Sequence, residues 1–404
     1  MVDFLCGDAR EVLALLPDGC CSICITSPPY LGLRSYNLEP VRWADGEVCC
    51  LGLEESVDSY VRHLVEVFAE VHRVLHDEGV LFIVIGDSYA RNPKKGQHRP
   101  GDPGKQAYVY DQGGGRASTA FDPAGSNLKE GDLCFVPHRV AWALQSWGWV
   151  CRDEIVWLKS NCLPASVKNR TTRQHEFVFL LTKQSSGYFY DEEPIREEAA
   201  RTQATPVRYG SRKGASKEMV GAASERTTSG REYVGGGTRR PRSVWSIATE
   251  PTSENHFACF PTKLVERLLL CGSSEVGACP NCGVQWRRVV QRGEPDLEHQ
   301  RACGGDDEGE YAGANLKDYE SAGAQAASDV KRRILAGLCA RETVAWSRPC
   351  KCPHQPPVPS VALDCFSGSG TVGLVAKRLG RQAILIDAKD EYIRMSRRRC
   401  GEDD

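Results

Sequence analysis

The alternation of apolar and polar positions along the chain predicts strands and helices in turn. Residues 22–26 and 80–85 form short apolar runs rich in β-branched side chains, which are typical of strands buried in a sheet. Between these runs, apolar residues recur at helical spacing over 57–75. A strand that is apolar on both faces and follows a helix indicates a parallel sheet covered by helices, so the pattern predicts an α/β fold.

The same periodicities predict further elements in both halves of the chain. Helices are expected over 9–16, 137–147, 260–270 and 371–379. Strands are expected over 154–158, 176–182, 360–364 and 383–387. By contrast, 91–131 and 196–243 are rich in glycine and charge without any period, so we expect irregular segments there.

The composition is that of a globular protein, because 41% of the 404 residues are hydrophobic and 26% are charged. No stretch approaches the ~18 apolar residues of a membrane helix, and the first residues resemble no export signal. We therefore expect a cytoplasmic protein with no membrane partner. In that compartment its 19 cysteines stay reduced.

Charge is distributed unevenly, although the net charge of −2 points to no partner. Residues 201–245 hold ten Lys/Arg against three Asp/Glu, whereas 294–329 hold ten Asp/Glu against two Lys/Arg. A basic segment rich in Gly, Ser and Thr is suited to follow the phosphates of a nucleic acid, and the acidic segment would face away from them. Charge alone allows a second interpretation, in which both segments are solvated loops.

A glycine turn between a strand and a helix, at residues 361–371, predicts a site for a nucleoside cofactor. Gly368 and Gly370 let the backbone approach a ligand that a Cβ would exclude. Asp387 ends the next strand, where a carboxylate can bind ribose hydroxyls. The turn lacks the Lys-Ser/Thr of a triphosphate-binding loop, so ATP is disfavoured.

A second motif, Ser27-Pro28-Pro29-Tyr30, follows the strand over 22–26. Consecutive prolines have fixed φ and no amide hydrogen, so the carbonyls of Ser27 and Pro28 can be held outward as hydrogen-bond acceptors. With the Ser27 hydroxyl and the flat Tyr30 ring, these carbonyls form a site suited to a planar group that carries an amine. The alternative is a rigid turn with no chemical role.

Together the two motifs resemble those of the DNA amino-methyltransferases, which transfer a methyl group from S-adenosylmethionine to cytosine N4 or adenine N6. The catalytic motif precedes the cofactor motif, as in the β-class permutation of that family, with target recognition between them. Further likenesses lie around Asp8 and at 86–88, 173–176 and 256–261. The resemblance implies a permuted Rossmann-like fold with a mixed seven-stranded sheet, in a prokaryotic or phage-infected cell.

The resemblance also assigns residues, position by position. It implies a catalytic site formed by Ser27, Pro28, Pro29 and Tyr30. It implies a cofactor pocket in which Asp387 binds the ribose and Asp8 lies near the adenine, with the remaining contacts made by Asp364, Phe366, Gly368, Gly370, Phe260, Pro261 and Lys263. The chain departs from the common pattern at Cys365, where proline is frequent, which puts the local turn geometry in doubt.

The resemblance implies a double-stranded DNA substrate, with the target base flipped out of the stack into the Ser27–Tyr30 pocket. In that family serine at this position accompanies cytosine N4 more often than adenine N6, so cytosine N4 is the first interpretation and adenine N6 the second. Methylation at carbon 5 is disfavoured, because it needs a cysteine nucleophile after the proline. A cognate restriction endonuclease is a candidate partner, and the sequence leaves the oligomeric state and the DNA recognition sequence open.

Two other functional classes remain open. An inactive binding protein that keeps the fold would be expected to show damage in Ser27–Tyr30 or in the glycine turn, and both are intact. An RNA or protein methyltransferase is chemically possible, because RNA bases and amide side chains also present planar amines. The basic segment and the order of the motifs favour DNA.

Two cysteine pairs have the spacing of metal ligands, Cys279 with Cys282 and Cys350 with Cys352. Cys-x-x-Cys beside proline and glycine forms half of a zinc knuckle, and Cys-x-Cys can supply the second half. The pairs flank a long insertion, 283–349, whose ends a structural zinc would tie. Four reduced cysteines without a metal are the alternative.

The motifs and the composition shifts divide the chain into five segments. They are a catalytic half (1–195), a basic target-recognition segment (196–245), a cofactor-pocket helix region (246–278), a zinc-binding insertion (279–354) and a cofactor-binding half (355–404). Four tryptophans in apolar surroundings are expected in the core rather than at a base-stacking surface, namely Trp142, Trp147, Trp149 and Trp157.

Overall fold

The structure, a computed structural model, describes residues 1–32, 38–90, 127–162, 169–198, 238–250, 260–295 and 339–402. The chain divides into two compact units. The larger unit is drawn from 1–195, 242–288 and 346–404, and the smaller unit from 196–241 and 289–345. Most of the predicted loop over 91–131, of the basic segment and of the acidic segment lies outside the described residues, as do 256–259. All the predicted site residues belong to the larger unit.

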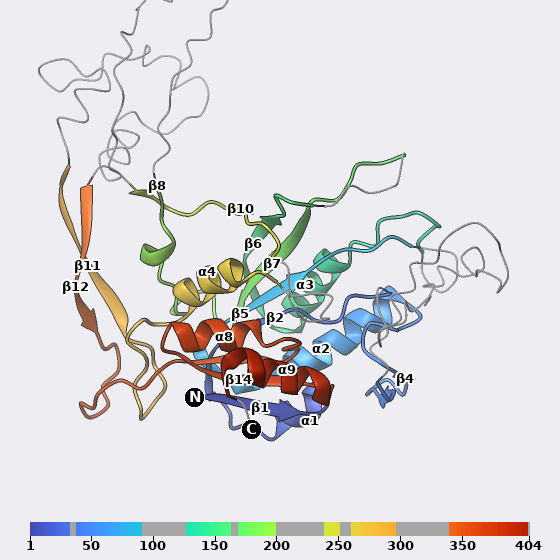
Figure 1. The fold of residues 1–404 in the computed structure, drawn as a ribbon, viewed down its shortest axis with the longest axis horizontal. Coiled ribbons are helices and arrows are strands. Elements are labelled where there is room, and N and C mark those ends of the chain that lie inside the picture. Colours follow the sequence, from blue (N-terminus) through green and yellow to red (C-terminus); the bar gives the residue numbers. More distant parts are fainter. Residues whose placement is uncertain are drawn as a thin grey trace, which may run out of the picture. The chain divides into compact units, whose positions relative to one another are not determined.

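An eight-stranded mixed sheet forms the centre of the larger unit (Figure 1). Neighbouring strands are parallel except where β7 pairs with β5 and β6. This confirms the α/β fold, and the three-residue edge strand β10, too short to show a period, adds an eighth strand to the seven expected. In spatial order the strands are β1 (Val2–Cys6), β14 (Gln382–Asp387), β13 (Val361–Asp364), β2 (Cys21–Thr26), β5 (Leu75–Ile85), β7 (His175–Thr182), β6 (Val150–Leu158) and β10 (Val244–Ser246).

The strand directions bring the functional motifs to one edge of this sheet. Since β14, β13, β2, β5 and β6 run in the same direction, their carboxyl ends meet at the same edge. The antiparallel strand β7 has its amino end there, so Glu176 reaches that edge as well. At the centre Leu363 of β13 pairs with Cys24 of β2, which joins the two ends of the chain.

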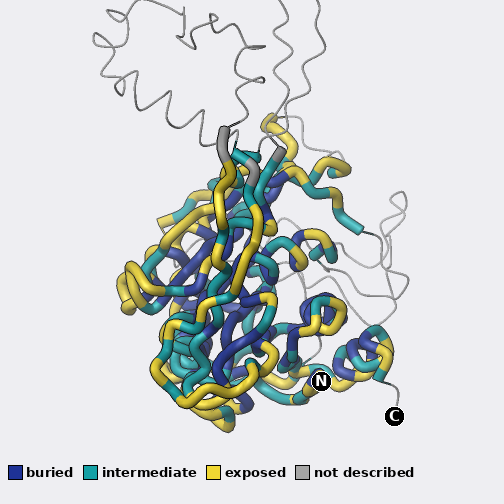
Figure 2. Tube along the Cα trace, turned by 90° about the vertical axis from the view of Figure 1, so that its left-hand side faces the viewer, coloured by how far each residue is buried: buried dark blue, intermediate teal, exposed yellow. Residues whose placement is uncertain are grey.

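Helices cover both faces of the sheet (Figure 1). Buried residues of α1 (Ala9–Ala14), α2 (Val57–Val74) and α3 (Val136–Trp147) share one apolar cluster. Residues of α4 (Thr262–Gly272) and α8 (Thr371–Arg378) share a second, and α9 (Asp390–Cys400) packs against α8 and β1. Figure 2 shows the buried residues concentrated between these layers. None of the described helices is long and apolar enough to cross a membrane.

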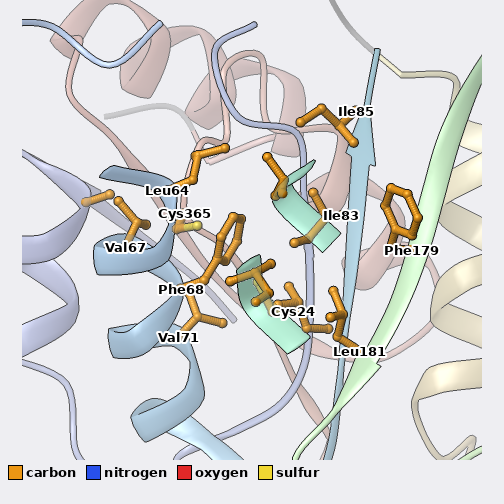
Figure 3. Close-up of a cluster of buried hydrophobic side chains, with 14 of the residues drawn as sticks. Cys24, Leu64, Val67, Phe68, Val71, Ile83, Ile85, Phe179, Leu181 and Cys365 are labelled. Atoms are coloured by element: carbon orange, nitrogen blue, oxygen red, sulfur yellow. The ribbon is translucent and has the colours of Figure 1, made fainter. Parts of the chain in front are cut away.

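Helix α2 shows how local and tertiary signals agree. Ser56 caps its start, because the Ser56 side chain accepts a hydrogen bond from the Ser59 backbone nitrogen at 3.0 Å. The apolar stripe of the helix then packs on the sheet, whose strand residues alternate between the two apolar clusters. Figure 3 shows this contact, which includes Leu64, Val67, Phe68 and Val71 of α2 and Cys24, Ile83, Ile85, Phe179 and Leu181 of the sheet.

Shorter elements complete the described structure. They are the two-stranded sheets of β3 (Val41–Arg42) with β4 (Val48–Cys49), β8 (Glu197–Glu198) with β9 (Thr238–Arg239) and β11 (Arg287–Pro295) with β12 (Cys339–Ser347), and the 3-10 helix Glu193–Ile195. Periodicity did not reveal β1, β11, β12 or α9. The last of these is mostly charged, and its buried residues include only two large apolar side chains, Ile393 and Met395.

The four tryptophans divide into two pairs. Trp149 and Trp157 are buried, as predicted, whereas Trp142 and Trp147 on α3 are 73% and 44% exposed. The prediction was wrong for the second pair because α3 buries a different face, which includes Val140, Ala141 and Leu144.

Replacing Phe68 by alanine should lower the free energy of unfolding by about 3–5 kcal/mol, because it leaves a cavity between α2 and the sheet. Phe68 is fully buried. Trp142→Ala is the matched control, since it also removes a large aromatic ring from a helix, and the expected change is within about 0.5 kcal/mol. Denaturant unfolding followed by circular dichroism measures both. Equal losses in the two variants would contradict the packing of α2.

Candidate active site

A cavity of about 990 Å³ opens at the carboxyl edge of the sheet. It is large enough to hold a nucleoside cofactor together with a planar base. Its wall combines residues that follow β2, β5, β13 and β14 with residues at the amino end of β7. The predicted residues that line it are Asp8, Ser27, Pro28, Pro29, Tyr30, Phe260, Phe366, Gly368 and Asp387.

Four predicted cofactor residues are not among the described residues that line the cavity. Asp364 and Gly370 are buried in and beside the glycine turn. Pro261 precedes the first residue of α4, and Lys263 is exposed on that helix. Their contribution to a cofactor pocket stays a prediction.

The Ser27–Tyr30 tetrapeptide is held against α2 and the loop that precedes it. The Tyr60 hydroxyl of α2 donates to the Pro29 carbonyl oxygen at 2.7 Å. Gly52 lies so close that a Cβ there would be 3.2 Å from the Pro29 Cβ, and its φ of +87° favours glycine. The backbone of the tetrapeptide is therefore fixed on both sides, while Ser27 and Tyr30 line the cavity.

A buried polar contact supports the loop behind the tetrapeptide. Glu54 accepts the Gly52 backbone N–H at 2.8 Å, and its other carboxylate oxygen lies 3.0 Å from His63 Nδ1 on α2. Burial opposes a charge on His63, but hydrogen bonds to the carboxylates of Glu54 and Asp45 outweigh it and raise the pKa of His63. The loop is thus tied to α2 by a charge-assisted hydrogen bond.

Tyr30 belongs to a chain of hydrogen bonds along the cavity wall. Its hydroxyl donates to Glu176 Oε2 at 2.8 Å, and the Ser27 hydroxyl donates to the Tyr30 oxygen at 3.5 Å. Lys159, directly after β6, binds the other oxygen of Glu176. Gly86 makes room for the Tyr30 ring, because a Cβ there would lie 2.8 Å from the ring carbon Cε2.

This chain of hydrogen bonds orients the Ser27 hydroxyl. Burial raises the pKa of Tyr30 well above its ordinary value, and Glu176 adds to the shift, so Tyr30 stays protonated at neutral pH. The single hydroxyl hydrogen of Tyr30 is committed to Glu176, and its oxygen accepts from Ser27. The lone pairs of the Ser27 oxygen can then accept hydrogens from a bound amine.

The glycine turn is tied to strand β2 by a buried contact. Thr26 Oγ1 donates to Asp364 Oδ1 at 2.7 Å, and the Phe366 backbone nitrogen donates to the same oxygen at 3.1 Å. The second oxygen, Oδ2, is buried and has no hydrogen-bond partner among the described residues. Burial raises the pKa of Asp364 to about 7.

Asp387, the last residue of β14, holds the glycine turn through hydrogen bonds. Its two oxygens accept the backbone N–H groups of Gly368 at 2.8 Å and Lys389 at 2.9 Å, while burial raises its pKa to about 6. Gly368 and Gly370 have φ of +49° and +73°. A Cβ at Gly370 would lie 2.7 Å from the Ser396 Cβ of α9, so this glycine is required for helix packing.

These features fit S-adenosylmethionine. Asp387 lines the cavity, where its carboxylate would accept ribose hydroxyls, and Asp364 lies behind the wall with one oxygen that has no hydrogen-bond partner among the described residues. Both carboxyls have raised pKa values, so the stability that they contribute is complete below about pH 4 and is lost as the pH rises through 6 to 7. A bound cation and bound hydroxyls would offset that loss.

Some residues of the wall were not identified from the sequence. Lys159, Trp43 and Trp157 line the cavity, and the Arg10 guanidinium lies 3.8 Å from the centre of the Trp43 ring while it binds Asp8. The one sequence signal for Lys159 was its place directly after a predicted strand. Trp43 follows the two-residue strand β3, which has no period to read.

The four cysteines of the predicted metal site lie together in the larger unit. Their sulfur atoms are all within 4.8 Å of one another, although the two pairs are separated by residues 283–349.

Comparison with known proteins identifies relatives. The DNA methylase family designated N6_N4_Mtase matches residues 21–279 and 357–398. The chain is 36% identical over 267 residues to the type II methyltransferase M.Cfr9I of Citrobacter freundii, which covers 66% of this chain and 71% of that protein. It is 34% identical over 271 residues to the type II methyltransferase M.SmaI of Serratia marcescens, and the aligned region covers 67% of this chain and 75% of that protein. The solved PvuII cytosine-N4-specific DNA methyltransferase aligns with a TM-score of 0.48 and 14% identity, over 99% of this chain and 87% of that one.

The affinity for S-adenosylmethionine should fall as the pH drops from 7.5 to 5. Asp387, whose pKa is about 6, must be ionised to accept ribose hydroxyls in addition to its two backbone N–H groups. Protonation of one such carboxyl weakens binding by up to about tenfold per pH unit below its pKa. Isothermal titration calorimetry at several pH values measures the effect.

The asparagine variants separate the two carboxyls. Asp387→Asn should bind the cofactor about tenfold more weakly at pH 7.5 and lose the pH dependence near 6. Asp364→Asn should retain that dependence, because Asp364 titrates near pH 7. A wild-type pH profile in Asp387→Asn would contradict a ribose-binding role for this residue.

Proposed function

The chain belongs to the N6_N4_Mtase family of DNA methylases, and we propose that it transfers a methyl group from S-adenosylmethionine to cytosine N4 within a specific sequence of double-stranded DNA. The hydrogen-bond chain from Ser27 through Tyr30 to Glu176 carries the proposal, because it presents an acceptor to an amine. Adenine N6 is the second candidate, since the same acceptor suits both amines.

The exocyclic amine of a base is a weak nucleophile because its lone pair is delocalised into the ring. Ser27 Oγ and the Pro28 carbonyl would accept the two amine hydrogens, which draws the nitrogen toward tetrahedral geometry and localises its lone pair. The cofactor supplies a sulfonium methyl group, so the C–N bond forms as the S–C bond breaks and the positive charge passes from sulfur to nitrogen. The nitrogen then loses a proton to solvent.

Two cationic side chains line the cavity. Beside its amine cytosine presents the acceptor N3, with O2 next to it on the same edge, whereas adenine presents N1 on one side of its amine and N7 on the other. Lys159 and Arg173 both line the cavity, and each is a donor that already has one carboxylate partner, Glu176 and Asp87 respectively. Such donors suit either base, so the preference for cytosine N4 comes from the Ser27-Pro28-Pro29-Tyr30 motif, because serine at this position accompanies cytosine N4 more often in the resembling family.

A stacked base cannot reach these residues, so the proposal requires base flipping. In the duplex the amine is paired, while Ser27 and Tyr30 line a cavity at the edge of the sheet. Phosphate contacts from the basic segment 196–245 would hold the duplex. Within the smaller unit Arg239 is paired with Glu197, so a phosphate contact from Arg239 would have to compete with that pair.

The relatives indicate the biological setting. Both are named type II methyltransferases, and the proposed role is modification that protects DNA from a cognate restriction endonuclease. Methylation at carbon 5 is a poor fit, because Cys24 of β2 is fully buried and burial raises its pKa well above the ordinary value.

Tyr30→Phe should lower the rate of methyl transfer by about 10- to 100-fold, because it removes the hydroxyl that orients Ser27. Glu176→Gln should act through the same series of hydrogen bonds. The rate of the double variant should therefore lie within about threefold of the rate of the slower single variant. Tyr188→Phe is the matched control, because Tyr188 does not line the cavity and its hydroxyl accepts a hydrogen bond from Arg152 at an exposed position, so activity should be unchanged.

The assay uses radiolabelled S-adenosylmethionine and a DNA substrate under single-turnover conditions, with cofactor affinity measured in parallel. Additive losses from Tyr30→Phe and Glu176→Gln, or losses that arise from cofactor affinity alone, would contradict the orienting role of the chain of hydrogen bonds.

DNA methylated in vitro should contain N4-methylcytosine when its nucleosides are analysed by mass spectrometry. Ser27→Ala should reduce the yield per unit time by about 10- to 100-fold through loss of one acceptor. If the product is N6-methyladenine without N4-methylcytosine, the target base is adenine and the proposal of cytosine is wrong, but the proposed mechanism at an exocyclic amine still holds. Full activity in Ser27→Ala combined with Tyr30→Ala would refute the catalytic site.

A further inference from the structure

Four cysteine sulfurs form a compact cluster on the larger unit, remote from the cavity in the fold. Cys279 and Cys282 follow α4, and Cys350 and Cys352 follow β12. All four sulfurs lie within 4.8 Å of one another. In a tetrahedral zinc site sulfur lies ~2.3 Å from the metal, which places the sulfurs roughly 3.8 Å apart. The cluster therefore has the size of a zinc tetrathiolate.

The first cysteine pair sits in a tight turn built to stabilise a thiolate. The Gly283 backbone nitrogen donates to the Cys279 carbonyl at 2.9 Å, and the Cys279 nitrogen donates to Val284 at 2.9 Å. Gly283 has a φ of +71°, which closes the turn. The backbone N–H groups of Asn281 and Cys282 donate to the Cys279 sulfur. Such donors favour the charged form that binds metal.

The cluster cannot hold four negative charges without a cation. Bound metal would be surrounded by four thiolates, and the four sulfurs lie within 4.8 Å of one another, so without a cation their charges would repel strongly. A divalent metal reverses this cost, because it deprotonates the thiols that coordinate it. Soft sulfur ligands in a set of four select zinc among common divalent cations.

The surrounding backbone shows that the cluster is part of the fold. Ala278 and Val358 exchange backbone hydrogen bonds at 2.7 and 2.9 Å. A Cβ at Gly277 would lie 2.1 Å from the Val358 carbonyl oxygen, so the two segments are in close contact. His76 Nε2 lies 2.8 Å from the Cys282 carbonyl oxygen, which ties the turn to β5.

These neighbours place the cluster at the opposite end of the sheet from the cavity. His76 is the second residue of β5, and Val358 lies just before β13. The cavity, by contrast, lies where the same strands end. A metal at the cluster cannot contact the reacting groups, and its four cysteine ligands leave no open position for catalysis.

We propose that Cys279, Cys282, Cys350 and Cys352 bind one structural zinc ion that clamps the base of the β11–β12 insertion. Strand β11 begins at Arg287, shortly after the first pair, and β12 ends at Ser347, shortly before the second. The chain leaves the larger unit after Arg288 and re-enters it at Trp346. Zinc joins the outgoing and returning segments and thereby holds α4 and β13 together at the base of the insertion.

Metal analysis of the purified full-length protein, without DNA or cofactor, tests the proposal independently of methyl transfer. About one zinc per chain is expected. Cobalt substitution should give tetrahedral d–d absorption and a sulfur-to-cobalt charge-transfer band. Folded protein that lacks metal after addition of zinc, or that forms disulfides within the two pairs instead, would overturn it.

Matched variants identify the ligands. Cys279→Ser with Cys350→Ser removes one ligand from each pair and should reduce zinc to below about 0.2 per chain, whereas Cys20→Ser with Cys151→Ser should leave it near one. Cys352→His keeps four ligands and should keep the metal, which guards against a variant that merely misfolds. Loss of zinc in the Cys20 and Cys151 control, or its retention in Cys279→Ser with Cys350→Ser, would exclude this ligand set.

Chelation tests the structural role. Removal of the metal should speed protease cleavage within 284–349 at least several-fold. The cleavage rate is measured without any methyl-transfer assay, so the result does not depend on the proposed function. Identical cleavage rates with and without metal would show that zinc does not clamp the insertion.

Discussion

The pairing of β2 with β13 is the constraint on which the rest of the structure depends. It joins strands from the two ends of the chain, and each strand is followed at its carboxyl end by one of the two predicted motifs. A buried hydrogen bond from Thr26 to Asp364 joins the last residues of these two strands. Ser27 follows directly after Thr26, and the glycine turn follows directly after Asp364. A shift of one residue in this register would turn the two motifs to opposite faces of the sheet.

The reversal of β7 completes the site that this pairing begins. Because β7 alone among the strands of the sheet runs antiparallel, Glu176 at its start reaches the edge where the other strands end. There it binds Tyr30, while Lys159 offsets its charge. The Ser27 hydroxyl is thus oriented through residues of three strands, and a local turn could not have held it.

Buried polar groups make this edge less stable than the core below it. Asp364 keeps one carboxylate oxygen without a partner among the described residues, and burial raises the pKa values of both Asp364 and Asp387. The apolar layers between α2 and the sheet supply the stability that such a site lowers. The cysteine cluster lies at the other end of the strands, where an insertion can be anchored without disturbing the cavity.

The sequence by itself determined most of the central strands and helices and the local motifs. Periodicity predicted helix α2 and strand β5. Ser27–Tyr30 and the glycine turn could be recognised from the sequence because each motif consists of adjacent residues. Only the tertiary structure decided that Glu176 supports Tyr30, that Asp364 is not on the cavity wall, and that four cysteines meet. Those facts depend on strand order and direction, which place residues from distant parts of the chain in contact, and hydrophobic periodicity carries no information about which distant segments will pair.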